Sequence, residues 1–261
     1  MSTDNIEIDA NTIIVAKRRR LAMRQDQVPA NAVIALANMQ KGSQSILTEV
    51  TDHTDPIKLI GRIRHEDIYD PVGQALRFTR YHTDAITLFT DNKIYSKGME
   101  DLTFVSKGIH TPLITQDYIL NAYHVAEARA AGASGLVIYA SLLDWAQLRD
   151  IVSNTMRWRM TAIVQVNSEQ QLADAARLSP HVIAIGHGHD FDTEVDLDLY
   201  RHLHDYIPFN TRIMPMGCLH HIEDVEAIVD IGTDALIVSE SLLQSPHAPH
   251  LRHLLGREQD T

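Results

Sequence analysis

The sequence is poor in three features, cysteine, long hydrophobic runs and positive charge, and each shortage excludes a class of protein. It has a single cysteine, Cys218, so an internal disulfide framework is excluded. No apolar run approaches the roughly 20 residues that cross a bilayer. The N-terminal stretch MSTDNIEIDANTIIVAKRRR begins with acidic residues and has no apolar segment typical of a secretory signal. We therefore expect a cytoplasmic location.

Acidic residues outnumber basic ones, 34 against 23, and the formal charge is −11. Like charges repel on approach, which argues against nucleic acid or an anionic membrane as a partner. The basic run Lys17 to Arg20 is the exception, and on a short helix such a run is typical of a solvated face. The partner classes that remain are a small-molecule ligand and another protein.

The chain is long enough to bury a full core, with 261 residues of which 44% are apolar. Short β-branched apolar runs recur along it, with amphipathic segments between them. Their hydrophobicity is continuous rather than alternating, which is typical of parallel strands covered on both faces. The runs predict eight strands, at residues 45–50, 85–90, 112–117, 135–140, 162–167, 182–186, 212–216 and 235–239.

The intervening segments have helical periodicity and recognisable ends. Asp144 and Ser168 are suited to cap helix N-termini, and Gly132 and Gly232 are suited to follow helix C-termini. The predicted helices include residues 122–132, 144–155, 168–178 and 222–232.

Eight strand and helix units without a linker predict an α/β protein, a single (β/α)₈ TIM barrel domain over residues 1–261. Residues 1–43 are expected to form an N-terminal helical extension laid against one end of the barrel. An open doubly wound sheet is the alternative, but no Gly-x-Gly-x-x-Gly turn follows the first predicted strand.

In such barrels the chemistry lies at the carboxyl ends of the strands and in the loops that follow them. Only four residues with a full charge occupy these places, and all are acidic. They are Glu49, Asp91, Asp117 and Glu240. A barrel that acts on a phosphorylated and carboxylated metabolite would need cations there.

The segment IMPMGCLHH, residues 213–221, places Cys218 beside two histidines. His187 and His189 could face Cys218 and His220, because strands six and seven of a barrel are neighbours. Imidazole and thiolate are good ligands for zinc. The spacing matches no known metal motif, however, and the chain has 15 histidines. We interpret these residues as loop histidines and expect no metal or cofactor, with a metal site on the same residues as the alternative.

Several stretches together carry a resemblance to a known family. They include IIVAKRRRL near the N-terminus, ILTEV, KGMEDL at 97–102, EVDL at 194–197, and a long stretch at 116–144 that contains EARAAGAS. EDVEAIVDIGTDALIV at 223–238 and ESLL at 240–243 complete the set. In order and length they resemble the indole-3-glycerol phosphate synthase family, whose members decarboxylate and cyclise a carboxyphenylamino deoxyribulose phosphate in tryptophan biosynthesis.

The resemblance implies which positions would carry catalysis, and most of these differ here. Glu49 corresponds to a first-strand glutamate, whereas Thr51 stands where a lysine is expected two residues later. Gln116 takes the place of the lysine that acts as general acid, and Gln165 takes the place of a strand-five glutamate.

The positions that would bind substrate and phosphate differ as well. Gly186 and Gly188 replace an asparagine and a phosphate-binding arginine on strand six. Met216, Gly217 and Cys218 replace Glu-Ser-Gly on strand seven, and Ser239, followed by Glu240, replaces a phosphate-binding glycine on strand eight.

These replacements remove the groups that the family reaction needs. A positioned acid or base each accelerates proton transfer by about 10²–10⁴, and glutamine, glycine and methionine cannot transfer protons at neutral pH. The sequence therefore predicts a diverged family member in which Glu49 is the only retained catalytic position. We expect it to be inactive in the ring closure and repurposed for binding or assembly. The alternatives are an active carboxy-lyase or a barrel enzyme with a new His/Cys metal site.

Overall fold

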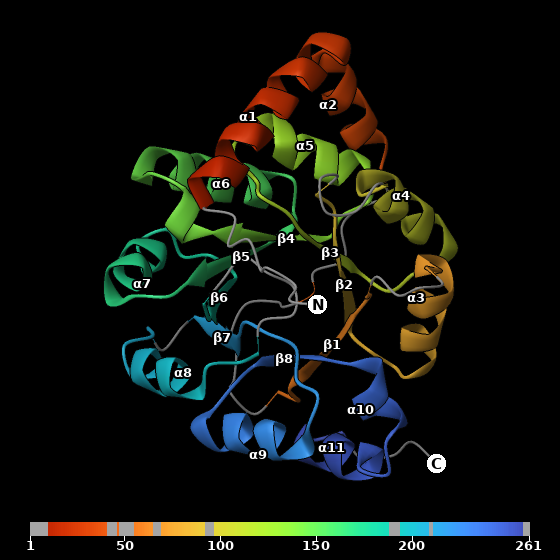
Figure 1. Cartoon of the computed structure of the whole chain (residues 1–261), viewed down its shortest axis with the longest axis vertical. Coiled ribbons are helices and arrows are strands. Elements are labelled where there is room, and N and C mark those ends of the chain that lie inside the picture. The colour runs from red at the N-terminus through yellow and green to blue at the C-terminus, as the bar shows by residue number, and fades with distance from the viewer. Residues whose placement is uncertain are drawn as a thin grey trace, which may run out of the picture.

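The computed structural model describes residues 10–40, 46, 55–64, 69–91, 97–187, 194–208 and 211–257. Eight parallel strands occupy its centre, and helices surround them (Figure 1). The strands are β1 Lys58–Arg62, β2 Ala85–Phe89, β3 Leu113–Gln116, β4 Gly135–Tyr139, β5 Thr161–Val166, β6 Val182–Ile185, β7 Arg212–Pro215 and β8 Ala235–Val238.

The strands follow one another around the sheet in chain order, and β1 pairs with β8 as well as with β2. The remaining seam, between β7 and β8, is bridged just beyond the end of β7. There Leu219 N donates to Ile237 O at 2.9 Å, and Ser239 N donates to Leu219 O at 3.0 Å. The predicted (β/α)₈ barrel is confirmed.

The helices around the barrel begin and end largely where their capping residues predict. Asp144 and Gln147 form a reciprocal capping box, and Ser168 accepts a hydrogen bond from Gln171 N. Gly232 ends its helix with a φ of 114°, a conformation that favours glycine. The helices are α3 Pro71–Arg80, α4 Met99–Gly108, α5 Ala122–Ala130, α6 Trp145–Arg157, α7 Glu169–Ala176, α8 Leu197–His204, α9 Ile222–Ile231, α10 Glu240–Gln244 and α11 Ala248–Leu254, with a short 3₁₀ turn at Ala140–Leu142.

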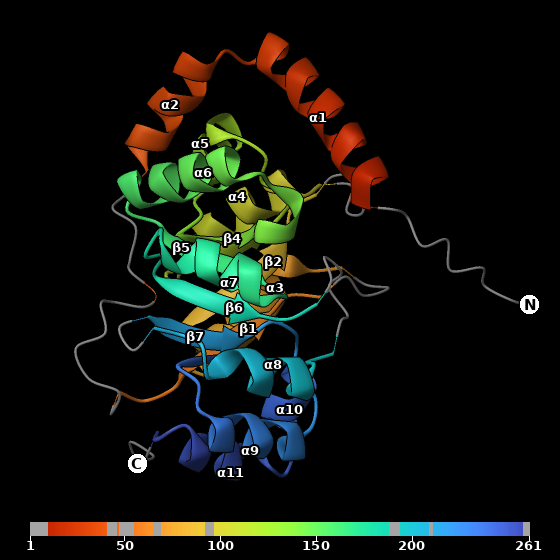
Figure 2. The same ribbon diagram turned by 90° about the vertical axis from the view of Figure 1, so that its left-hand side faces the viewer.

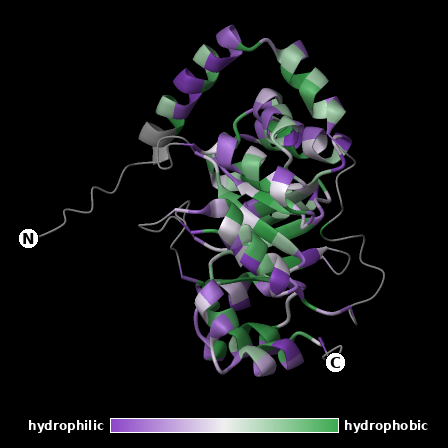
Figure 3. Ribbon diagram, turned by 90° about the vertical axis from the view of Figure 1, so that its right-hand side faces the viewer, coloured by the Kyte–Doolittle hydropathy of each residue, from purple (hydrophilic) through white to green (hydrophobic). Residues whose placement is uncertain are grey.

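Apolar side chains fill both faces of the sheet. One buried cluster lies inside the barrel and includes Ile60, Ile114 and Ile163, while a larger one lies between the strands and the outer helices. Figure 3 shows the strands as the most hydrophobic part of the molecule. None of the described helices is both long and apolar enough to cross a membrane.

The first strand is Lys58–Arg62, and the prediction of a first strand at residues 45–50 is wrong. KLIGR has a lysine and an arginine at its ends and only a short apolar run between them, so its strand pattern is weak. SILTEV has a composition more typical of a strand. Of residues 45–50, only Ile46 is described. Its backbone N–H donates to Thr161 Oγ1 at 3.4 Å, at the start of β5, so Ile46 lies at the amino end of the barrel.

Two helices precede the barrel, α1 Ala10–Gln27 and α2 Ala30–Met39, as expected for a helical extension. Figure 2 shows them as an inverted V above α5 and α6. Val33 and Ala37 of α2 are buried, and α2 packs on α5.

Lys17 anchors α1 to the barrel through two buried aspartates. Its Nζ lies 2.9 Å from Asp91 Oδ2 and 2.6 Å from Asp117 Oδ1, just beyond the ends of β2 and β3. Arg20 adds a contact of 3.1 Å to Asp91. The predicted solvated face is therefore wrong for Lys17, which is 8% exposed, because the barrel supplies partners far away in sequence.

Asp117 is the centre of this network. Thr90 Oγ1 donates to its Oδ2 at 3.0 Å, and His124 Nε2 lies 3.3 Å from the same oxygen. Burial by itself would raise the pKa of the Asp117 carboxyl, but His124 and Lys17 beside it hold that pKa well below its usual range. The ionised carboxylate is thus the form that the fold requires.

We expect Asp117→Asn to lower the free energy of unfolding by about 3 kcal/mol at neutral pH, because it removes one of the two carboxylates that compensate the buried Lys17. A carboxyl whose pKa is lowered in the folded state stabilises above its unfolded pKa of about 4, and the effect is lost as pH falls below that value. In denaturant unfolding, the difference in free energy of unfolding between wild type and variant should therefore become smaller at acidic pH. The exposed Asp198→Asn variant is the control, and its free energy of unfolding should match that of the wild type.

Gly61 is required for β1 to approach α3. A Cβ at this position would lie 2.3 Å from Cδ1 of Phe78, which is fully buried. We expect Gly61→Ala to destabilise the fold by about 1–3 kcal/mol through overpacking. Thermal denaturation of the double variant with Phe78→Leu should show a smaller penalty for Gly61→Ala. An equal penalty in both backgrounds would contradict the steric explanation.

Candidate functional site

The carboxyl ends of the strands form the mouth of the barrel, where side chains alternate between inside and outside. Three strands carry an inner-cluster isoleucine two residues before their polar residue. The polar residues therefore face the interior at the mouth. They are Arg62 after Ile60, Gln116 after Ile114, and Gln165 after Ile163.

Gln116 and Gln165 are each 3% exposed, so both amides lie inside the protein. Gln165 Nε2 donates to the backbone O of Gly186 at 2.8 Å, which links the ends of β5 and β6. An amide can orient a ligand by hydrogen bonds, but it has no proton to exchange at neutral pH. These two positions are therefore suited to binding rather than to acid–base chemistry.

Arg62 corrects the expectation that no cation lies at the strand ends. It is the last residue of β1, and it is 4% exposed. Arg64 follows two residues later. Both were missed because the first strand was placed at residues 45–50. Glu49 and Thr51, the residues predicted at this end of the barrel, lie outside the described part of the chain.

Three aromatic rings form a wall at the mouth, and the sequence analysis did not identify them. The Phe89 and Tyr118 rings are perpendicular, with centroids 5.8 Å apart, and the Tyr139 ring lies 6.0 Å from that of Tyr118. All three are less than a tenth exposed. Phe89 and Tyr139 end β2 and β4, so the two-residue period of the strands is the signal that could have found them. A wall of this kind suits the flat apolar part of a ligand.

The ends of β7 and β8 are closed by packing. Met216 and Cys218 belong to the inner apolar cluster, and Gly217 between them has a φ of 146°. Ser239 caps α10 by accepting from Leu242 N at 3.2 Å. Glu240 binds Arg77, with Oε2 3.1 Å from Nη2.

The positions predicted to bind phosphate differ in their surroundings. Cys218 and Ser239 are buried, and Glu240 places a carboxylate beside them. Gly188, the position of the missing arginine, lies outside the described residues. Whether the predicted positions bind phosphate stays a prediction.

The histidines near β6 and β7 do not form a metal site within the described ranges. His187 Nε2 lies 3.3 Å from Asp196 Oδ2, and Asp196 in turn caps α8. Cys218 is 3% exposed. No group of three or more His, Cys, Asp or Glu in the described part of the chain could hold a metal ion, and His189 lies outside it.

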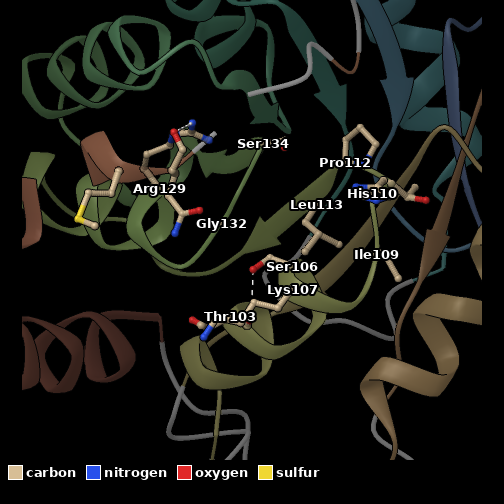
Figure 4. Close-up of a pocket in the computed structure, with 13 residues that line it drawn as sticks. Thr103, Ser106, Lys107, Ile109, His110, Pro112, Leu113, Arg129, Gly132 and Ser134 are labelled. Carbon is tan, nitrogen blue, oxygen red and sulfur yellow. Dashed lines mark hydrogen bonds between the residues drawn. The ribbon is translucent and has the colours of Figure 1, made fainter. Parts of the chain in front are cut away.

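A large cavity of about 490 Å³ opens at the other end of the barrel, beside the amino ends of β3 and β4 (Figure 4). Lys107 and Arg129 line it from the last turns of α4 and α5. Basic residues at helix C-termini complement the partial negative charge of the exposed carbonyls, and Arg129 Nη1 donates to Ala133 O at 3.2 Å. Their role is therefore structural, and the mouth is the candidate functional site.

Comparison with known proteins agrees with this architecture. The model of the family described as indole-3-glycerol phosphate synthase matches residues 10–254. Similar proteins of that name include one from Oceanobacillus iheyensis, 25% identical over 230 residues that cover 88% of this chain and 86% of the relative. Another, from Roseiflexus sp., is 26% identical over 252 residues, 90% of this chain and 93% of the relative. A third, from Mycobacterium ulcerans, is 28% identical over 178 residues, 68% and 65% of the two chains.

The match covers both N-terminal helices, all eight strands and the final two helices, α10 and α11. This chain therefore belongs to the indole-3-glycerol phosphate synthase family.

Proposed function

We propose that this chain binds a small anionic ligand in the barrel mouth and does not catalyse the decarboxylating ring closure of its family. The observation that carries the proposal is that Gln116 and Gln165 face the barrel interior at the ends of β3 and β5. Where the family resemblance calls for an acid and a base, this chain has two amides. The partner class, a cytoplasmic location and the lack of a cofactor stay predictions from the sequence.

The loss of proton-transferring groups has a large effect on rate. An acid and a base contribute about 10²–10⁴ each, so losing both removes most of the acceleration that proton transfer supplies. Residues that act as a unit do not compensate for one another, because each step needs all of them in place. A partial set of family residues would therefore give little turnover.

Strand order favours Arg62 and Arg64 for the two family positions that the sequence analysis gave to Glu49 and Thr51. Arg62 ends the true first strand, and Arg64 lies two residues later, which is the spacing of the family's glutamate and lysine. An arginine in place of a glutamate reverses the charge at the mouth. A guanidinium binds carboxylate or phosphate by paired hydrogen bonds, so the expected ligand is an anion.

The second candidate function is the family reaction itself. The relatives described above are named indole-3-glycerol phosphate synthase, and the aromatic wall with Arg62 would suit a substrate that has a ring and negative charges. Catalysis would then require proton donors other than Gln116 and Gln165. A turnover assay separates the two candidates.

We expect purified protein to convert no carboxyphenylamino deoxyribulose phosphate to indole-3-glycerol phosphate above the uncatalysed rate. Indole fluorescence would follow the product, with the Oceanobacillus iheyensis relative as a positive control. The gene should also fail to restore growth of a tryptophan auxotroph. Turnover or growth would overturn the proposed loss of activity and support the second candidate.

Binding is tested separately from turnover. The same substrate should raise the melting temperature of the wild type, and Arg62→Gln should weaken its apparent affinity about tenfold or more, because one charge-assisted contact is lost. The exposed helical variant Arg149→Gln removes the same charge away from the mouth and should bind like wild type. Equal affinity in all three proteins would show that Arg62 holds no ligand.

A further inference from the structure

A second, smaller cavity of about 130 Å³ lies outside the barrel, between α1, the start of α4 and α5. Lys17, Arg20, Lys97 and His124 are among the residues that line it. We propose that this cavity is a binding site for a small anion, an inorganic phosphate or the phosphate or carboxylate group of a metabolite. The proposal does not depend on the fate of the family reaction.

The lysines and arginines of this cavity come from two separate parts of the chain. Lys17 and Arg20 lie on α1, where both reach Asp91. Lys97 precedes α4, is exposed, and forms no ion pair within the described part of the chain. A cation that none of the described carboxylates neutralises, beside two others, is a strong donor for an incoming anion.

The N-terminus of α4 lies at the same cavity, which Met99 also lines. The residue at its N-cap is Gly98, which has no side chain to cap the helix. The first backbone N–H groups of a helix lack partners within the helix and carry partial positive charge, so an anion is a suitable acceptor for them. This helix has ten residues.

His124 supplies an independent observation. It is 3% exposed, and its buried Nδ1 has no hydrogen-bond partner among the described residues, while its Nε2 lies 3.3 Å from Asp117. A buried polar atom without a partner is costly, and native proteins rarely keep one unless a ligand or water satisfies it. A ligand in this cavity that reaches His124 would remove that cost.

Three carboxylates also line the cavity, and two of them are already neutralised by cations. Asp117 pairs with Lys17, and Glu127 pairs with Arg24. Glu100 forms no ion pair within the described part of the chain, and it lies in the first turn of α4. Its charge would oppose a bound anion and compete for the same amides.

Substitutions of Lys97 and Glu100 are therefore expected to change the affinity for phosphate in opposite directions. In a titration of the full chain with inorganic phosphate, followed by calorimetry, Lys97→Gln should weaken binding about tenfold, and Glu100→Gln should strengthen it. The exposed Arg149→Gln control should match the wild type. Both cavity variants change exposed side chains, so they should fold, which circular dichroism can verify.

Hydrogen–deuterium exchange would locate the bound phosphate. Phosphate should slow exchange in α1, which carries Lys17, and in α4, which begins two residues after Lys97. The proposal would be overturned if phosphate does not bind, if the three variants bind alike, or if protection appears only around β7 and β8. A parallel titration with propionate tests which anionic group the cavity prefers, because a site for carboxylates should bind propionate more tightly than phosphate.

Discussion

The closed parallel barrel imposes the constraint on which every other feature depends, because each strand is buried on both faces and its residues alternate strictly between them. Ile60, Ile114 and Ile163 fill the interior, so the residues two positions later must face the mouth. The chemistry of the mouth is therefore decided by where each strand begins. Placing the first strand at residues 45–50 instead of 58–62 assigns Glu49, rather than Arg62, to the mouth.

The described part of the mouth combines Arg62, two glutamines and an aromatic wall that includes Tyr118 and Tyr139. These groups can orient an anion that has a flat apolar part, and the guanidinium and the two amides transfer no protons at neutral pH. Met216 and Cys218, just beyond β7, belong to the inner apolar cluster and contribute packing rather than polar groups to the mouth.

The N-terminal helix α1 contributes to the stability of the barrel. Lys17 bridges two buried aspartates that lie just beyond the ends of β2 and β3, and removing it would leave both with less charge compensation. The same arrangement leaves a cavity between α1 and the start of α4. The mouth and the cavity are adjacent in space and share the ends of β2 and β3, but Phe89 and Gln116 face the barrel interior whereas Thr90 and Asp117 line the cavity outside it. A ligand in one therefore need not exclude a ligand in the other.

The sequence by itself determined the barrel, seven of its eight strands and the caps at Asp144, Ser168 and Gly232, because local periodicity and capping chemistry are encoded in neighbouring residues. It also placed Gln116 and Gln165 at strand ends. Only the tertiary structure decided that Lys58–Arg62 is the first strand and that Lys17 is buried. Both depend on partners far away in the chain, β8 for the strand and Asp117 for the lysine, and a local pattern carries no information about them.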